Sequence, residues 1–368
     1  MARSSALSLF AFKGIRVQLH WSFPLLIIWV AATALMGGMR PVLALQQVAY
    51  VLVLFACVVL HEFGHALTAM RYGIRTRNIT LYPIGGVASL ERIPEKPAQE
   101  LAVALAGPAV NLVIATVVGL LLWATGHAVL LAEPGERVGL GALAAVVVAG
   151  NIGLLLFNLV PAFPMDGGRV LRALLALRMD RVRATRIAAM LGRIIAVGFI
   201  IAALYWKQPV LGLIGLFVIL GASAEKQLVE TQGALRGVRV RDVMRTRFWT
   251  LPPEALVQQA ADELLAGGDH HLVVVEHGRF VQVVPRSAII AAVQAGRQAD
   301  AVGALPGAAP VAVSPDAIVN DAMVRMNDEA QVPLPVVEAG RLVGILEMDN
   351  LSEYVALRGQ ASSGVPGA

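Results

Sequence analysis

The sequence predicts a polytopic α-helical membrane domain of about six transmembrane helices, followed by a cytosolic α/β domain pair. Three observations lead to this prediction. Of the 368 residues, 57% are hydrophobic and 15% are charged, whereas a soluble domain averages about 25% charged residues. Six apolar runs precede residue 223. Beyond that residue the composition becomes polar, and one segment is repeated at an offset of 62 residues.

The six apolar runs are the candidate spans. They cover residues 21–36, 43–66, 101–124, 139–159, 187–205 and 210–222. The second, third and fourth are long enough to cross a bilayer core, which takes about 20 residues of helix. The last two are shorter and close together, so they form either a spanning hairpin or two elements packed on the other spans. Further spans follow the first run, which argues against a cleaved signal peptide.

The Lys and Arg residues indicate how these spans are oriented. Residues 1–20 and the segments after the second and fourth runs carry 14 Lys and Arg, and the alternate loops carry only Arg40, Arg137 and Lys207. Basic residues accumulate on the cytoplasmic side of membrane proteins. We therefore expect a multi-pass protein of the cell membrane, embedded in the lipid bilayer, with both termini in the cytoplasm.

The net charge of +5 consists of two parts of opposite sign. Residues 1–222 hold 18 Lys and Arg against 8 Asp and Glu, a net charge of +10, and residues 223–368 have a net charge of −5. The positive charge belongs to the loops between spans, so it does not form the basic face that nucleic-acid binding requires. We expect no direct nucleic-acid partner. The single cysteine, Cys57, lies in an apolar run and excludes an internal disulfide.

The sharpest chemical signal is the segment His61-Glu62-Phe63-Gly64-His65. Residues four apart lie on one face of a helix, so both imidazoles can bind one zinc ion. Glu62 is then close enough to act as the general base toward a water at the metal. Ionisable residues within a span are costly and indicate function. The alternative is a group of polar side chains at a helix end that reaches the lipid headgroups.

A catalytic zinc site needs a third protein ligand and one open position. Cys57 lies one turn before His61 on the same helix, where its direction suits tetrahedral geometry poorly. Four other candidates lie at a membrane boundary, in the opposite-side loop or in an arginine-rich stretch: His20, Glu133, Glu136 and Asp180. They are less suitable ligands, which leaves Asp166.

Asp166 lies in the segment NLVPAFPMDGG, residues 158–168, where two prolines interrupt a helix. Irregular backbone at membrane depth is tolerated only where protein or a water-filled cavity surrounds it. This favours a buried polar site for Asp166. The alternative is an ordinary break between spans, with Asp166 as the cap of the next helix. The predicted orientation brings His61, His65 and Asp166 to the cytoplasmic side at similar depth.

The pair of motifs HEFGH and NLVPAFPMDGG resembles the site-2 protease family of intramembrane zinc metalloproteases. Three further segments agree with this resemblance over residues 15–222: HWSF at 20–23, GGVASL at 85–90 and AGPAVNL at 106–112. The resemblance implies that His61, His65 and Asp166 bind one Zn²⁺, that Glu62 is the catalytic acid and base, and that Asn158 lines the active site.

The resemblance also implies the reaction, which is hydrolysis of a peptide bond in or near a transmembrane segment of a membrane protein. The implied substrate is a single-pass or polytopic membrane protein, for example an anti-sigma or pro-sigma factor. A helical substrate must unwind before it is cleaved. Segment 78–90 has β-prone residues and a Gly-Gly pair, so it is either a strand edge for the unwound chain or a plain membrane-associated loop.

The C-terminal part contains two copies of one unit. Residues 269–293 align with residues 331–355, and 8 of the 25 positions are identical. Each copy predicts a helix, a β-branched strand, a turn at Gly278 or Gly340, a second strand and a final helix. Two such copies are expected to pack on each other. The pattern resembles a tandem pair of CBS domains, and the order of domains resembles the site-2 protease branch that carries them.

CBS pairs are similar to adenosine-nucleotide sensors in many proteins, where the second strand ends with Ser or Thr, two residues, then Asp. Here Pro285 and Ala288 stand at these places in the first copy, and Glu347 and Asn350 in the second. Glu347 would repel a phosphate, whereas Asn350 retains the ability to bond a ribose hydroxyl. Two roles stay open: an adenosine-nucleotide sensor, or a docking or homodimerisation module.

These observations divide the chain into segments. We expect a transmembrane zinc metalloprotease domain at 1–222, a helical linker at 223–237, CBS domains at 238–297 and 298–358, and a flexible tail at 359–368. Two competing interpretations are a CBS-regulated membrane transporter and a catalytically silent membrane scaffold. A transporter predicts intramembrane charges spread along a pathway, and a silent scaffold predicts loss of a zinc ligand or of the base.

Overall fold

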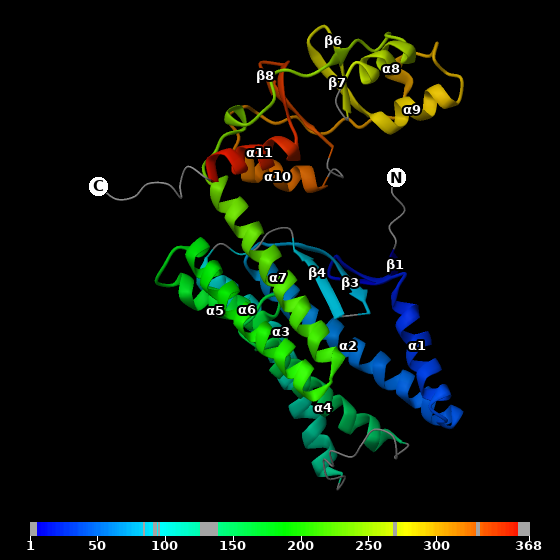
Figure 1. Cartoon of the computed structure of the whole chain (residues 1–368), viewed down its shortest axis with the longest axis vertical. Coiled ribbons are helices and arrows are strands. Elements are labelled where there is room, and N and C mark those ends of the chain that lie inside the picture. Colours follow the sequence, from blue (N-terminus) through cyan, green and yellow to red (C-terminus); the bar gives the residue numbers. More distant parts are fainter. Residues whose placement is uncertain are drawn as a thin grey trace. The chain divides into compact units, whose positions relative to one another are not determined.

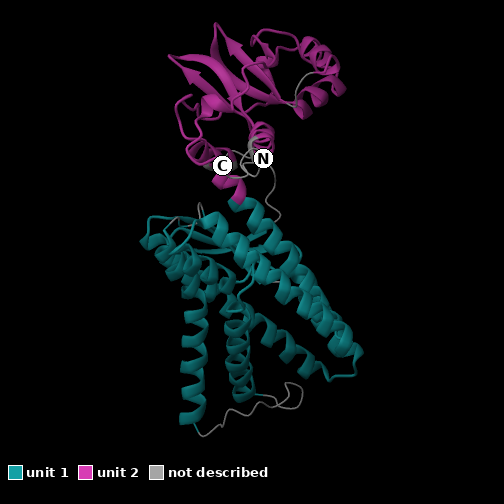
Figure 2. Ribbon diagram, turned by 60° about the vertical axis from the view of Figure 1, so that its left-hand side comes forward, with its two compact units in different colours: residues 1–229 teal, residues 230–368 magenta. Residues whose placement is uncertain are grey.

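The computed structural model describes residues 6–83, 85–90, 94, 96–125, 139–267, 271–328 and 332–359. The chain forms two compact units, Met1–Val229 and Glu230–Ala368 (Figure 2). The boundary lies within helix α7 (Pro209–Ala234). Most of the predicted linker therefore continues the last apolar helix. Residues 360–368 of the predicted tail lie outside the described residues.

Five helices in the described part of the first unit are long and apolar enough to cross a membrane (Figure 1). They are α2 (Pro41–Arg71), α3 (Pro97–Ala124), α4 (Leu140–Asn158), α6 (Arg181–Trp206) and α7 (Pro209–Ala234). The first apolar run forms α1 (Phe23–Met36), whose 14 residues rise about 21 Å. A bilayer core is about 30 Å thick. The polytopic helical fold is confirmed, with five long apolar helices and one short apolar helix among the described residues.

The surface of these helices has the polarity that a bilayer favours. Large apolar side chains such as Leu156, Leu204 and Leu220 are more than half exposed, whereas Asn111 and Asn151 are fully buried. In a bilayer the exposed faces would contact lipid, and the two buried amides would be shielded from it. The last two apolar runs belong to helices of 26 residues each, so each of them is long enough to span.

A four-stranded sheet packs against one side of α2. Its strands, in spatial order, are β1 (Ala6–Phe12), β2 (Ile15–His20), β3 (Thr76–Tyr82) and β4 (Gly85–Leu90). The middle pair is parallel and the two outer pairs are antiparallel. Ile15, Val17 and Ile79 bury Phe63 and Ala66 of α2. Segment 78–90 is therefore a hairpin, and β4 is an edge strand of the described sheet.

A short loop connects α4 to helix α5 (Asp166–Ala176). Phe163 of this loop is fully buried against Ala188, Ala189 and Ala222 of α6 and α7. A Cβ atom on Gly221 of α7 would lie 2.5 Å from Pro164 Cδ, so the loop and α7 are in direct contact. The Phe163–Pro164 peptide is cis. The break between α4 and α5 is thus enclosed by helices, as the polar-site interpretation requires.

The second unit has the predicted repeat. Its elements are η1 (Val240–Asp242), β5 (Thr250–Leu251), α8 (Val257–Leu265), β6 (His271–Glu276), β7 (Arg279–Pro285), α9 (Arg286–Gln294), η2 (Val302–Ala304), α10 (Val319–Asp328), β8 (Leu334–Glu338), β9 (Arg341–Leu346) and α11 (Met348–Gly359). Each copy contains the predicted helix, hairpin and final helix. Both hairpins turn at two residues with positive φ, His277 and Gly278 in the first and Ala339 and Gly340 in the second.

The pairing of the strands repeats at the same offset of 62 residues. Leu251 pairs in parallel with Val274 in the first copy, and Val313 pairs in parallel with Val336 in the second. Each copy has a separate apolar core, one around Val274 and one around Val336. The internal repeat is thereby confirmed.

Candidate metal centre

The structure brings together the three side chains that were predicted to bind zinc. His61 and His65 lie on α2 with their Nε2 atoms 3.0 Å apart. Asp166 is the first residue of α5, and its Oδ2 lies 3.0 Å from His65 Nε2 and 3.2 Å from His61 Nε2. The three residues are only 4–7% exposed. Three potential ligand atoms therefore converge in a buried site.

The arrangement of these three atoms fits a zinc ion. Ligand atoms on a tetrahedron around Zn²⁺, with bonds of about 2.0–2.1 Å, lie roughly 3.3 Å apart. The observed separations of 3.0–3.2 Å are close to that value. Two imidazoles and one carboxylate are a donor set of catalytic zinc sites, which keep the fourth position open. Within the described residues this is the one such group of His, Cys, Asp or Glu.

Helix α3 supplies polar contacts that orient both imidazoles. His65 donates from Nδ1 to the backbone carbonyl of Val103 at 2.7 Å, which leaves Nε2 free for a metal. The amide of Asn111, fully buried, lies 3.1 Å from His61 Nδ1. The Oδ1 atom of Asn111 has no hydrogen-bond partner among the described residues. Rotating the Asn111 amide by half a turn exchanges its oxygen and nitrogen, and Oδ1 then accepts a hydrogen bond from a protonated His61 Nδ1.

These α3 contacts were not predicted as part of the site. Asn111 and Gly107 lie in the segment AGPAVNL, which entered only through the family resemblance. A polar amide within an apolar span is the signal that points to Asn111, because such a group needs a buried partner. Val103 contributes a backbone carbonyl, which its side chain does not reveal.

Gly107 allows α3 to approach the histidines closely. A Cβ atom at this position would lie 2.2 Å from His65 Nε2 and 2.7 Å from His61 Cε1. Both separations are shorter than any normal contact, so a side chain would displace the imidazoles. A glycine is needed here because only a residue without a side chain leaves space for the two imidazoles.

We expect Gly107→Ala to lower zinc affinity by about 10–100-fold, the range found when residues that orient metal ligands are changed. Zinc retention by the purified full chain against a competing chelator measures this. Gly119→Ala is the matched control, because a Cβ on that α3 glycine meets only Val148 Cγ2 at 4.0 Å. Equal zinc retention in both variants would contradict the assigned role of Gly107.

The surroundings of Asp166 favour its ionised form. Burial raises the pKa of this carboxyl, but hydrogen bonds with His61 and His65 lower it, and the net pKa is well below the usual range. The N-terminus of α5 also favours a negative charge in its first turn. No side chain caps α5 at Met165, and the carboxylate faces the two imidazoles. The structure thus favours the polar-site interpretation over the helix-cap alternative.

Glu62 is half-buried beside the edge strand β4. A Cβ atom on Gly86 would lie 2.9 Å from Glu62 Cγ and 3.4 Å from Glu62 Oε1. Because Gly86 has no side chain, the backbone of β4 runs directly past the Glu62 carboxylate. Glu62 is next in sequence to His61, one of the three candidate ligands, and its carboxylate lies close to the backbone of Gly86 in β4.

Asn158 and the rejected ligand candidates lie in other surroundings. Asn158 is the half-buried last residue of α4, and its place at the active site stays a prediction. His20 contacts the Ser22 hydroxyl at 2.6 Å, and Asp180 caps α6 by accepting from the Val182 amide at 2.9 Å. Glu133 and Glu136 lie outside the described residues.

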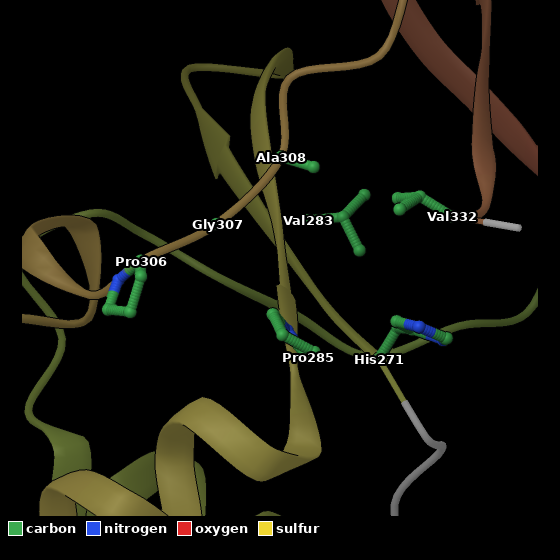
Figure 3. Close-up of a pocket in the computed structure, with 7 residues that line it drawn as sticks. All are labelled: His271, Val283, Pro285, Pro306, Gly307, Ala308 and Val332. Atoms are coloured by element: carbon green, nitrogen blue, oxygen red, sulfur yellow. The ribbon is translucent and has the colours of Figure 1, made fainter. Parts of the chain in front are cut away.

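The second unit contains a pocket of about 230 Å³ (Figure 3). Its lining residues are His271, Val283, Pro285, Pro306, Gly307, Ala308 and Val332. Pro285 is the residue that replaces the hydroxyl of the usual nucleotide-binding pattern. Among the described lining residues, His271 alone has a polar side chain. The pocket therefore has an apolar wall where a phosphate-binding pattern would place Ser or Thr.

Comparisons with known proteins identify the families to which the two units are similar. The family model of peptidase family M50 matches residues 49–132 and 126–201, and the CBS domain model matches residues 240–295 and 302–357. The zinc metalloprotease MJ0392 of Methanocaldococcus jannaschii is 29% identical over 354 residues, which cover 96% of each chain.

Two further proteins are similar to parts of this chain. The putative zinc metalloprotease Rip3 of Mycobacterium tuberculosis is 32% identical over 283 residues, which cover 72% of this chain and 70% of that protein. The solved site-2 protease of Methanocaldococcus jannaschii is 33% identical, with a TM-score of 0.45, and the match covers 60% of this chain and 95% of that one.

The chain belongs to peptidase family M50, the site-2 proteases. It is a zinc metalloprotease with several membrane helices and a C-terminal tandem pair of CBS domains. The predicted family, enzyme class and metal are thereby confirmed.

Proposed function

We propose that this protein is an intramembrane endopeptidase that hydrolyses a peptide bond in or near a transmembrane segment of another membrane protein. The observation that carries the proposal is the buried triangle of His61, His65 and Asp166. Its two histidines lie on α2, a helix long and apolar enough to span. A hydrolytic site at membrane depth acts on chains that reach that depth, which are the transmembrane segments of other proteins.

The residues of the site have distinct roles in this reaction. His61, His65 and Asp166 hold the metal, and Asn111 and the Val103 carbonyl orient the two imidazoles. Zinc, when bound there, acts as a Lewis acid that polarises the scissile carbonyl and activates water. Glu62 accepts the proton of the attacking water and delivers it to the leaving amine. Asn158 donates a hydrogen bond to the carbonyl oxygen as negative charge develops on it.

Strand β4 is the element that presents the substrate. A helical substrate has its carbonyls in internal hydrogen bonds, so it must unwind before attack. An unwound segment can add to the sheet along the free edge of β4 with backbone hydrogen bonds. Support for this comes from Gly86, whose backbone passes beside the Glu62 carboxylate, because a strand added there would carry its backbone past the catalytic base.

The potential metal-binding group favours a protease over a transporter or a silent scaffold. Within the described part of the membrane domain, the one potential metal-binding group has three buried ligands with the base beside it. A transporter would need such groups along a pathway, and a silent scaffold would have lost one of them. The basic segments on one side support an active site toward the cytoplasm, with both termini there.

The CBS pair is a regulatory or homodimerisation module in this proposal. Its pocket beside Pro285 is lined mainly by apolar residues, and Glu347 at the corresponding strand end of the second copy forms an ion pair with Arg245 at 3.2 Å. These features support docking or self-association at least as strongly as binding of an adenosine nucleotide.

The substrate of the protease, for instance an anti-sigma or pro-sigma factor, is a membrane protein.

A comparison of membrane proteomes tests this function. Cells that express the wild-type chain and cells that express Glu62→Gln are compared by quantitative mass spectrometry of membrane and soluble fractions. We expect specific membrane proteins to accumulate intact in the variant, and their soluble fragments to disappear. Glu353→Gln, on the exposed face of α11, is the control and should match the wild type. Identical proteomes in all three strains would refute the proposal.

A further inference from the structure

A buried ionic cluster lies apart from the zinc ligands, in the same membrane unit. Arg172 of α5 is fully buried. Its Nε donates to Glu100 Oε1 at 2.7 Å, and its Nη1 donates to Glu225 Oε1 at 2.5 Å. Arg181 lies 3.5 Å from the other oxygen of Glu100. Two guanidinium groups and two carboxylates thus balance in charge, and the fully buried Arg172 is paired with both carboxylates, as a buried charge requires.

The Arg172–Glu100 pair joins the two helices that build the metal centre. Glu100 lies in the first turn of α3, one turn before Val103, whose carbonyl accepts from His65. Arg172 lies on α5, the short helix that begins with Asp166. The pair therefore connects the helix that orients the histidines to the helix that carries the third ligand.

The guanidinium of Arg172 also contacts the loop that leads to Asp166. It lies over the Phe163 ring at 5.0 Å from the centroid, and Phe163 is fully buried. Glu225 approaches the same guanidinium from α7, the helix whose Gly221 is in contact with Pro164. Helices α5 and α6, which enclose this region, pack on each other (Figure 1). The loop that leads to Asp166 and the helices α3, α5 and α7 thus meet at the buried guanidinium of Arg172.

We propose that Arg172 is a positioning residue for the zinc site, and that its pairs with Glu100 and Glu225 hold Asp166 at the correct distance from the two histidines. This inference rests on the proposed function, because it takes His61, His65 and Asp166 as the zinc ligands. The ion pairs of Arg172 are with Glu100 and Glu225, so it would act on the ligands through the elements that carry them. Its planar guanidinium bonds two carboxylates and stacks on Phe163 at once, a combination that Lys does not provide.

Two variants of the full chain in detergent test this role. Glu225→Gln removes one charge and keeps the shape of the side chain, and Arg172→Lys keeps the charge and removes the planar fork. We expect each to lower zinc affinity about tenfold, the lower end of the range for residues that orient metal ligands. The visible spectrum of the cobalt-substituted protein should change in position or intensity, because it reports the geometry of the ligands.

Three further variants make the result specific. Arg193→Gln is the matched control, since Arg193 is exposed on α6 and reaches Ser223 of α7 at 3.4 Å without contacting the loop. Glu225→Asp keeps the carboxylate and should recover part of the zinc affinity. The proposed function predicts that Asp166→Asn lowers zinc affinity more than about 100-fold, well beyond the effect of the cluster variants.

The outcomes separate the two proposals. Wild-type zinc affinity and an unchanged cobalt spectrum in both Glu225→Gln and Arg172→Lys would overturn the positioning role. This holds even when the two variants melt at a lower temperature, because the cluster would then contribute to stability alone. Retention of zinc by Asp166→Asn would instead show that the proposed zinc site is wrong. If one of the two cluster variants does not fold, the other decides the question by the same two measurements.

Discussion

Glu62→Gln is expected to lower the rate of peptide-bond hydrolysis by about 10²–10⁴-fold, the contribution of a general acid and base, while the protein keeps its zinc. Glutamine preserves the shape of the side chain beside Gly86 but accepts no proton at pH 7. Zinc binding should persist because the three converging ligand atoms belong to other residues. The measurement pairs cleavage of a reconstituted membrane substrate with the zinc content of the purified full chain.

The control for this experiment is again Glu353→Gln, an exposed glutamate of the second unit, which should cleave at the wild-type rate. A Glu62→Gln variant that retains zinc and still cleaves at that rate would show that Glu62 is not the acid and base. A variant that loses zinc would place Glu62 within the metal site, and its catalytic role would have to be reassigned.

Asp166→Asn is expected to lower zinc affinity more than about 100-fold and to abolish activity with it. Changes in residues that only orient metal ligands cost about 10–100-fold in affinity, and Asp166 is a ligand candidate itself, 3.0 and 3.2 Å from the two Nε2 atoms. Asparagine fits the same space but brings no charge to offset that of the metal ion. Chelator competition on the purified full chain measures the change.

Asp180→Asn is the matched control for Asp166→Asn. Asp180 lies in the same basic segment, and its carboxylate accepts from backbone amides at the start of α6, a capping role that asparagine also performs. We expect this variant to bind zinc normally. If Asp180→Asn lost zinc and Asp166→Asn kept it, the third ligand would have been assigned to the wrong aspartate.

Most of the fold could be predicted from the sequence because hydrophobic patterns act locally. Runs of apolar residues produced five long helices and one short one, and the repeat produced two similar α/β copies with turns at Gly278 and Gly340. The exact ends of the helices were harder to predict from the sequence. Polar residues after 222 extend α7 to Ala234, since helix hydrogen bonds continue as long as nothing interrupts them.

The three candidate zinc ligands could also be predicted from the sequence, two from their spacing and the third by excluding other acidic residues and the cysteine. Spacing of four residues puts His61 and His65 on one face, and few other acidic residues lie near the spans. The residues of α3 were harder to find, because the role of Gly107 depends on how closely two helices approach, and that of Val103 on its backbone carbonyl. Neither property is visible in a motif.

The sequence by itself determined the membrane character and the tandem CBS copies, and it predicted the three candidate zinc ligands, because composition, periodicity and spacing are properties of the chain. Only the tertiary structure decided which groups surround those ligands. The contact of Asn111 with His61 and the burial of Arg172 between Glu100 and Glu225 join residues that are 50 to 72 positions apart. Such contacts form only when helices pack, and their geometry depends on every side chain between them.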